Sequence, residues 1–239
     1  MPDQAESFAQ GQGRLTHGPQ ANALVERTLE FVRDQLPGWR DRKDRKYETD
    51  EERLNAQLCK HLNARSRQVP LPVLFHHEEK QIGHRRVDIS AGPAEGGFVG
   101  TTYHSIDDPF LVLEGKRLPP PGGKAREREY VTGQEKRTGG IQRFKLGLHG
   151  EKVATAVLIG YLQKDSPTVW HQRINGWIRD LENALPLGEE LWTHGEQLQT
   201  LAQAKATRMS SCESRHGRAS RADSPEIRIL HFWIEMTQS

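Results

Sequence analysis

The chain has 239 residues, of which 34% are hydrophobic and 28% are charged, and its net charge is only +2. This length supports a real hydrophobic core, and the near-neutral charge neither requires nor excludes a nucleic-acid partner. The sequence has no signal peptide and no apolar run long enough to cross a bilayer, so we expect a cytoplasmic protein with no membrane partner. Cys59 and Cys212 form neither a disulfide framework nor a zinc-ligand spacing.

The chain is expected to begin with a tail and two helices. Residues 1–19 are rich in Gln, Gly and Ser without hydrophobic periodicity, which predicts a disordered tail. Apolar residues at helical spacing over 21–36 predict a helix that ends at Pro37-Gly38. A second helix is predicted to begin at Thr49, because Thr49 and Glu52 match a capping box.

Three strands are then predicted, because the hydrophobic period changes from helical to extended. The first two are expected over 69–76 and 84–90. The third is a continuous apolar run over 110–113, which is typical of a central strand covered on both faces. The prolines and glycines of 119–123 end this strand, and we expect the basic segment after them to be mobile.

The second half of the chain predicts two more helices and two more strands. A helix is expected over about 132–148, followed by a strand over 153–162 and a helix that begins at Ser166-Pro167. Residues 204–224 are small, polar and basic, which predicts a flexible insert, and alternation over 228–236 predicts a closing strand. This order predicts an α/β fold in which helices flank a mixed central sheet.

Charged residues end the second and third predicted strands, at Asp88 and at Glu114-Gly115-Lys116. Side chains two residues apart on a strand share a face, so Glu114 and Lys116 are expected to lie together. Carboxylate oxygens suit Mg²⁺, and a lysine beside the metal can position water or offset developing charge. The alternative is a strand-ending turn at Asp88 and an exposed Glu114–Lys116 ion pair. The position of both groups after apolar strands favours the metal site.

These residues and the order of elements resemble the PD-(D/E)XK nuclease superfamily, which has the restriction-endonuclease-like fold. The resemblance extends over about 49–162, and Val87 stands where the proline of the motif's name would be. It implies that residues 20–239 form a single nuclease-like domain that uses Mg²⁺, with Mn²⁺ able to substitute. It also implies that Asp88, Glu114 and the Gly115 carbonyl bind the metal, while Lys116 serves the attacking water.

Many members of this superfamily add a glutamate from the first core helix, and two glutamates here are candidates. At about 100° per residue, Glu51 falls on the buried stripe of Leu54 and Leu58, whereas Glu52 points away from it. Glu51 is therefore the preferred catalytic candidate. The alternative is that Glu51 only interacts with the helix dipole.

The resemblance further implies a polar residue near the scissile phosphate, contributed by the helix after the third strand. Gln142 is the catalytic candidate there, and a solvated helix face is the alternative. Basic residues around these elements are the predicted DNA contacts: Arg117, Lys124, Arg126, Arg143 and Lys145. A metal site at His76–Glu79 is disfavoured, because adjacent residues of a strand face opposite ways.

The leading hypothesis is a Mg²⁺-dependent nuclease that hydrolyses DNA, in a bacterial defence or DNA-processing system. One alternative is a catalytically silent subunit that binds nucleic acid or forms a complex, and another is an RNA nuclease. Besides DNA, the expected partners are a second protein in a defence complex or a second copy of the chain. The basic segment 208–221 is a candidate contact for such a partner.

Overall fold

The computed structural model describes residues 23–80, 86–133, 137–184, 191–218 and 222–236, and it is built around one seven-stranded sheet. The strands of this sheet are β1 Val73–Lys80, β2 Arg86–Pro93, β5 Leu111–Leu118, β6 Thr155–Leu162, β7 Ala202–Ala204, β8 Met209–Gly217 and β9 Glu226–Glu235. They lie in the order β1-β2-β5-β6-β9-β8-β7. The pairs β5–β6 and β6–β9 are parallel, and the other neighbouring pairs are antiparallel.

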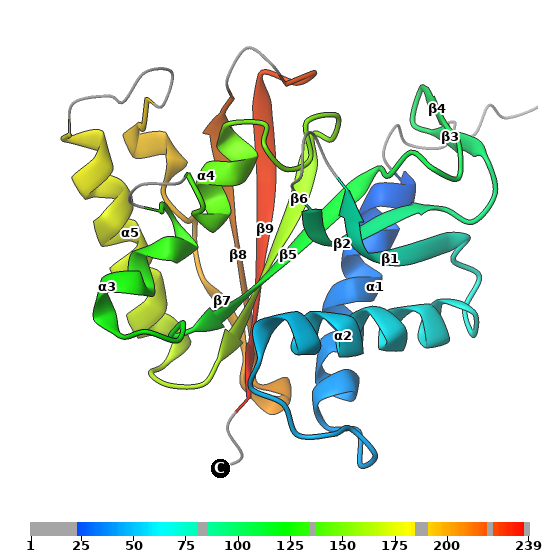
Figure 1. Cartoon of the computed structure of the whole chain (residues 1–239), viewed down its shortest axis with the longest axis horizontal. Coiled ribbons are helices and arrows are strands. Elements are labelled where there is room, and N and C mark those ends of the chain that lie inside the picture. The colour runs from blue at the N-terminus through cyan, green and yellow to red at the C-terminus, as the bar shows by residue number, and fades with distance from the viewer. Residues whose placement is uncertain (1–22, 81–85, 134–136, 185–190, 219–221, 237–239) are drawn as a thin grey trace, which may run out of the picture.

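Helices cover both faces of the sheet, which confirms the predicted mixed α/β class. The helices are α1 Ala23–Arg40, α2 Glu51–Ser66, α3 Lys124–Glu127, α4 Gly140–Lys145 and α5 Pro167–Glu182, with short 3₁₀ turns at η1 Arg128–Tyr130, η2 His194–Glu196 and η3 Lys205–Thr207. A separate hairpin pairs β3 Gly97–Val99 with β4 Thr102–His104. Helices α1 and α2 lie on one side of the sheet, and α3 to α5 lie on the other (Figure 1). Each side has its own buried apolar cluster.

The helix starts show how local sequence chemistry positions these elements. Ser166 caps α5 as predicted, because its Oγ accepts a hydrogen bond from the Val169 N–H at 3.3 Å. The capping box predicted at Thr49 and Glu52 is wrong. Asp50 caps α2 instead, and its Oδ1 accepts from the Arg53 N–H at 3.1 Å.

The predicted end of the first helix at Pro37 is also wrong, because α1 continues to Arg40. Tertiary contacts hold this last turn. Trp39 is buried, and the Arg40 guanidinium donates to the Thr207 and Glu235 carbonyls at 3.0 and 3.3 Å. These contacts offset the helical hydrogen bond that a proline cannot make.

The flexible insert predicted over 204–224 is wrong for most of its length. Strand β8 occupies 209–217 and pairs with β9 along its whole length. Its buried positions include Cys212, Ser214 and His216. The Ser214 hydroxyl lies 2.8 Å from Nε2 of His216 and 2.8 Å from Nε2 of His231. The buried face of β8 carries small polar residues, so the sequence shows no hydrophobic alternation there and the strand was not predicted.

The helix predicted over 132–148 is much shorter in the structure, where α4 occupies 140–145. Gly139 packs against the chain before it, because an added Cβ would lie 2.3 Å from Thr132 Cα. The segment expected to be mobile after 119–123 forms α3 and η1, and Tyr130 in η1 is buried. The predicted disordered tail, 1–19, lies outside the described residues. No helix in the described part of the chain is long and apolar enough to cross a membrane.

Candidate functional site

Strands β2 and β5 stop pairing where the charged residues begin. Their antiparallel register ends at the pair Ile89–Leu113, whereas β5 continues to pair with β6 as far as Leu118. Beyond this point the Gly115 N–H donates to Oδ2 of Asp88 at 2.9 Å. The Asp88 carboxylate therefore takes the place of a ladder acceptor, at the point where the two strands separate.

The backbone of Gly115 faces this gap between the strands. The N–H and C=O groups of one strand residue point to the same side, so the Gly115 carbonyl also points towards β2 and Asp88. Any side chain at this position would displace Asn55, because an added Cβ would lie 2.0 Å from its Oδ1. Asn55 is buried on α2, and its Oδ1 accepts from the Tyr161 hydroxyl at 2.7 Å.

Lys116 joins two carboxylates that come from different elements. Its Nζ lies 2.8 Å from Oε1 of Glu51 and 3.0 Å from Oε1 of Glu114. The second oxygen of Glu51 accepts from the Arg117 N–H at 2.8 Å. Glu51 occupies the first position of α2, and its exposed neighbour Glu52 takes no part in these contacts. The structure thus brings together Glu51, Glu114 and Lys116, with Asp88 beside Gly115.

Glu114 is buried among three basic side chains. Its Oε1 lies 2.6 Å from Nη1 of Arg143, in addition to the contact with Lys116. Its Oε2 lies 3.1 Å from Nδ1 of His149, which is also buried. Arg143 was expected to contact phosphate, and in the structure it pairs with this carboxylate. His149 was not among the predicted site residues, since it lies in a loop after α4 that has no motif.

These contacts and burial shift the pKa values of Glu114 and Asp88, which lie on adjacent strands, in opposite directions. Burial alone would raise the pKa of Glu114, but Lys116, His149 and Arg143 together hold it well below its usual range. Burial raises the pKa of Asp88 to about 7, and repulsion by Glu114 adds to this effect. The surrounding carboxylates hold the pKa of Lys116 above its usual range in spite of burial. Lys116 is therefore a permanent cation at neutral pH, whereas Asp88 titrates there.

The donor atoms of this cluster fit a hard divalent cation. Asp88, Glu114 and the Gly115 carbonyl offer the oxygen ligands that Mg²⁺ prefers. Burial and then repulsion by Glu114 raise the pKa of Asp88, and a bound cation would favour its charged form. Among the described residues, no group of three or more His, Cys, Asp and Glu side chains is already arranged around a metal position. Glu114 would have to exchange one of its bonds to Arg143, Lys116 or His149 for the cation.

Two predicted site residues of α4 lie elsewhere. The Gln142 side chain is buried, and its Oε1 accepts from the backbone N–H groups of Gly133 and Gly139 at 3.0 and 3.3 Å. These bonds hold it against the loop before α4, so its expected position near the scissile phosphate is not supported. Lys145 is 3% exposed, and its Nζ donates to the Glu196 carboxylate and to the Gly217 carbonyl. The prediction that Lys145 contacts phosphate is wrong, because a buried and paired ammonium cannot reach a ligand in solvent.

The remaining predicted DNA contacts lie along β5 and α3. The Arg117 guanidinium donates to Oε1 of Gln163 at 2.8 Å. Arg126 is paired with Glu129 at 2.7 Å, and its side chain is half exposed. Lys124 is exposed at the start of α3. Of this set, Lys124 and Arg126 stay available at the surface.

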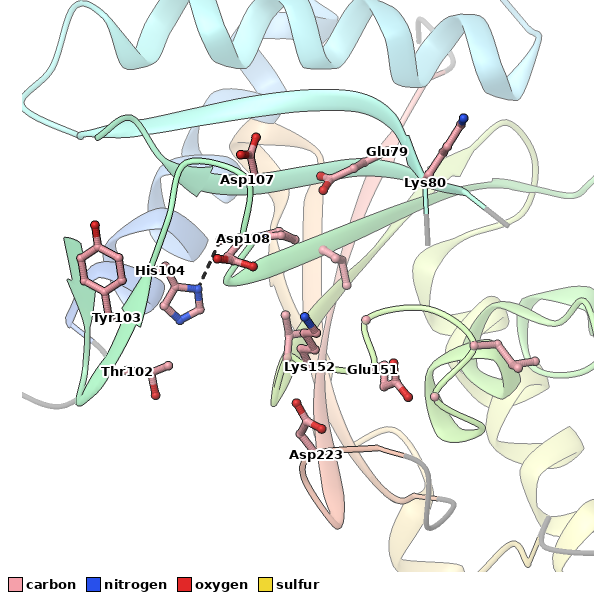
Figure 2. A pocket seen from close by; sticks show the side chains of 16 residues that line it. Glu79, Lys80, Thr102, Tyr103, His104, Asp107, Asp108, Glu151, Lys152 and Asp223 are labelled. Atoms are coloured by element: carbon pink, nitrogen blue, oxygen red, sulfur yellow. Dashed lines mark hydrogen bonds between the residues drawn. The ribbon is translucent and has the colours of Figure 1, made fainter. Parts of the chain in front are cut away.

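A hollow of about 480 Å³ lies between β1, the β3–β4 hairpin and the loop before β6 (Figure 2). Its charged lining comprises Glu79, Lys80, His104, Asp107, Asp108, Glu151, Lys152 and Asp223. Carboxylates outnumber ammonium groups in this lining, so the hollow disfavours a phosphate ligand. None of the predicted site residues lines it. The lining of this acidic hollow therefore does not include Glu51, Asp88, Glu114 or Lys116.

The carboxylate–lysine cluster is made of Glu51, Asp88, Glu114 and Lys116. Comparisons of the chain with protein-family models, with curated proteins and with solved structures found no match. The residues of the cluster and the order of the elements that carry them are accordingly the basis for a functional assignment.

Proposed function

We propose that this chain is a Mg²⁺-dependent nuclease of the PD-(D/E)XK type that hydrolyses phosphodiester bonds in DNA. The observation that carries the proposal is the position of Lys116 Nζ, which lies between Oε1 of Glu51 and Oε1 of Glu114 in the same cluster as Asp88. The order α2, β1, β2, β5, α4, β6 supports it, because it follows the order of a restriction-endonuclease-like core. The pairing of β2 with β5 ends before Asp88, so the Asp88 carboxylate and the Gly115 backbone face one another between the two strands.

Each residue of the cluster has a distinct role in this proposal. Asp88, Glu114 and the Gly115 carbonyl would hold Mg²⁺, which when bound lowers the pKa of a coordinated water and offsets charge on the phosphoryl oxygens. Lys116 stays protonated, so it acts as a fixed positive charge that orients the attacking water or a phosphate oxygen. Glu51 positions that ammonium through its 2.8 Å contact.

Arg143 has one proposed role in the metal-free site and another in the metal-bound site. Its side chain is 25% exposed, and its guanidinium contacts Glu114 at 2.6 Å. If Glu114 exchanged this contact for a bound cation, the guanidinium would be available for a phosphate oxygen. Arg143 therefore keeps its proposed role as a phosphate contact, but only in the metal-bound enzyme.

The proposal is tested with purified protein on plasmid, linear duplex, single-stranded DNA and RNA, in Mg²⁺ or Mn²⁺. Cleavage should stop in chelator and fall at least about 100-fold in Asp88→Ala and Lys116→Ala. Glu52→Ala is the matched control, because Glu52 adjoins Glu51 but is exposed. Wild-type rates in both site variants would overturn the site assignment. Cleavage of RNA in preference to DNA would move the substrate class to RNA.

One observation favours a second candidate function, a catalytically silent subunit that binds nucleic acid or forms a complex. Both oxygens of Glu114 are already bonded, by Arg143 and Lys116 on one side and His149 on the other. Such saturation also suits a structural ion-pair network. Titration calorimetry separates the two: a silent subunit gives no Mg²⁺ heat, whereas the proposed nuclease gives heat that Asp88→Asn removes.

A further inference from the structure

A cationic pocket of about 350 Å³ lies between the segment that joins α1 to α2 and the end of β9. Its lining residues are Arg40, Asp41, Arg42, Lys43, Arg45, Tyr47, Arg208 and Met236. Five of these residues are basic and one is acidic. In Figure 1 the α1–α2 segment lies at the same end of the sheet as the C-terminal end of β9. This pocket therefore has the opposite charge to the acidic hollow of Figure 2.

The positive charge of the cationic pocket is only partly offset. Asp41 accepts two hydrogen bonds from Arg40, at 2.7 and 2.6 Å, and it lies 3.6 Å from Arg208. Arg42 pairs with Asp44, which lies outside the lining, at 2.7 Å. Lys43 and Arg45 have no ion-pair partner in the described part of the chain. The pocket is thus left with uncompensated cations, which attract anions.

Arg45 adds a donor that has no acceptor. Its Nε donates to the Arg40 carbonyl at 3.1 Å, and its guanidinium lies 5.2 Å from the centre of the Trp39 ring. Its Nη1 is buried and has no hydrogen-bond partner among the described residues. Burial and repulsion by Arg42 lower the pKa of this guanidinium. Arg45 therefore adds to the wall of the pocket a positive charge that no acceptor among the described residues fully offsets.

A continuous set of buried side chains links this pocket to the carboxylate–lysine cluster. The Trp39 ring under Arg45 lies 5.7 Å from the Tyr161 ring, centre to centre. The Tyr161 hydroxyl donates to Asn55, and Asn55 packs directly against Gly115. In addition, the α1–α2 segment leads straight into Glu51 at the start of α2. The pocket and the cluster are therefore joined through packed side chains, and the segment that carries Tyr47 ends next to Glu51.

Tyr47 shows which kind of anion the pocket suits. Its side chain is 84% exposed beside the basic residues. An exposed aromatic ring next to cations is the arrangement that proteins use to bind single-stranded nucleic acid, by stacking a base while the cations hold its phosphate. A small inorganic anion has no base that could stack on this ring.

We infer that the cationic pocket binds a backbone phosphate of the nucleic-acid substrate, with Tyr47 against a neighbouring base. The inference rests on the proposed nuclease function for its role in presenting the strand to Glu114 and Lys116. It also replaces part of the predicted DNA surface. Lys145 and Arg117 are engaged with protein groups, whereas Lys43 is exposed and unpaired among the described residues.

The test measures binding in chelator, so that cleavage plays no part in it. Fluorescence anisotropy gives the affinity of labelled single-stranded and duplex oligonucleotides for wild type, Arg42→Ala/Lys43→Ala and Tyr47→Ala. The control is Lys60→Ala/Arg179→Ala, which removes two exposed charges outside the pocket. The pocket variant should bind about tenfold more weakly or worse. The slope of log affinity against log salt should fall by about one for each phosphate that the variant no longer neutralises.

Two outcomes would overturn the inference. The first is equal affinity of the pocket variant and its charge-matched control. The second is competition by inorganic phosphate that depends on Lys43 while oligonucleotide binding does not, which would assign the pocket to a free phosphoryl compound. Tyr47→Ala should weaken single-stranded binding more than duplex binding. If the wild type bound oligonucleotide through the pocket but cleaved no DNA in Mg²⁺, the nuclease proposal would be wrong and the pocket inference would still hold. Failure of the nuclease proposal can therefore be distinguished from failure of the pocket inference.

Discussion

The Nζ of Lys116 lies 2.8 Å from Oε1 of Glu51, although 65 positions separate the two residues in the chain. This contact joins the start of α2 to the end of β5, and it defines the carboxylate–lysine cluster. The ammonium is held by Glu51 on one side and by the buried Glu114 on the other. Glu51 is therefore expected to affect catalysis through the position of Lys116.

Substitution Glu51→Gln should slow cleavage about 10- to 100-fold, because Lys116 loses the charge that positions it. Folding stability should change by no more than about 1 kcal/mol, since the Glu51 side chain is 31% exposed. Single-turnover cleavage and urea unfolding measure the two effects. Glu52→Gln, one position along the same turn, should match wild type in both. A rate equal to wild type in Glu51→Gln would remove Glu51 from the site.

Substitution Asp88→Asn should stabilise the metal-free protein at pH 8. The pKa of Asp88 is raised from 3.8 to about 7 by burial and by Glu114. A raised pKa favours folding below the unfolded-state value, and this contribution is lost progressively as the pH rises from about 4 to about 7. The variant avoids that loss, so it should gain about 1–4 kcal/mol at pH 8 and little at pH 4. Urea unfolding at both pH values measures the difference.

Mg²⁺ should reverse the order of stability between these two proteins. The cation stabilises the form that binds it, and only wild type keeps both carboxylates. Unfolding of wild type and Asp88→Asn at pH 8, with and without Mg²⁺, tests this expectation. The idea that Asp88 is a metal ligand would fail if Mg²⁺ stabilised the two proteins equally.

Substitution Arg143→Ala should tighten Mg²⁺ binding while it slows cleavage. Arg143 contacts Glu114 at 2.6 Å, so it competes with a cation for that carboxylate. Without metal the variant should lose about 1–3 kcal/mol of stability, because Glu114 is buried with one partner fewer. Titration calorimetry measures the Mg²⁺ affinity, and chemical unfolding measures the stability. Arg126→Ala, on a surface pair with Glu129, is the control and should alter neither.

Substitution Gly115→Ala should destabilise the fold by about 1–3 kcal/mol, because the added Cβ would lie 2.0 Å from Oδ1 of Asn55. Asn55→Ala removes the clash, so the double variant should be more stable than the sum of the two single effects predicts. Gly176→Ala is the matched control. Gly176 lies inside α5 with nothing within 4 Å of an added Cβ, and helix propensity predicts a neutral or stabilising effect. Additive effects at Gly115 and Asn55 would show that the two groups do not meet.

The short-range part of the site could be predicted from the sequence. Strand periodicity predicts that Glu114 and Lys116 share a face, and in the structure the two side chains form an ion pair. The phase of α2 placed Glu51 on the buried stripe and Glu52 away from it, and in the structure Glu51 contacts Lys116. Both predictions depend only on the geometry of one element, and that geometry holds wherever the element lies.

The long-range part could not be predicted in this way. His149 meets Glu114 across 35 positions, from an irregular loop whose path depends on how α4 packs. The roles expected for Gln142 and Lys145 rested on the resemblance and on residue type, whereas the packing of α4 buries both side chains. Strand β8 was missed for a related reason, since its buried Ser214 and His216 hydrogen-bond to one another and give no apolar pattern.

The single-turnover rate of DNA cleavage by Lys116→Ala, in saturating Mg²⁺, tests the central claim most directly. Wild type should cleave, and the variant should cleave at least about 100-fold more slowly while DNA and Mg²⁺ still bind to it. This result would place the Lys116 ammonium in the reaction itself. Cleavage by Lys116→Ala at the wild-type rate, from protein purified free of other nucleases, would contradict the proposed mechanism.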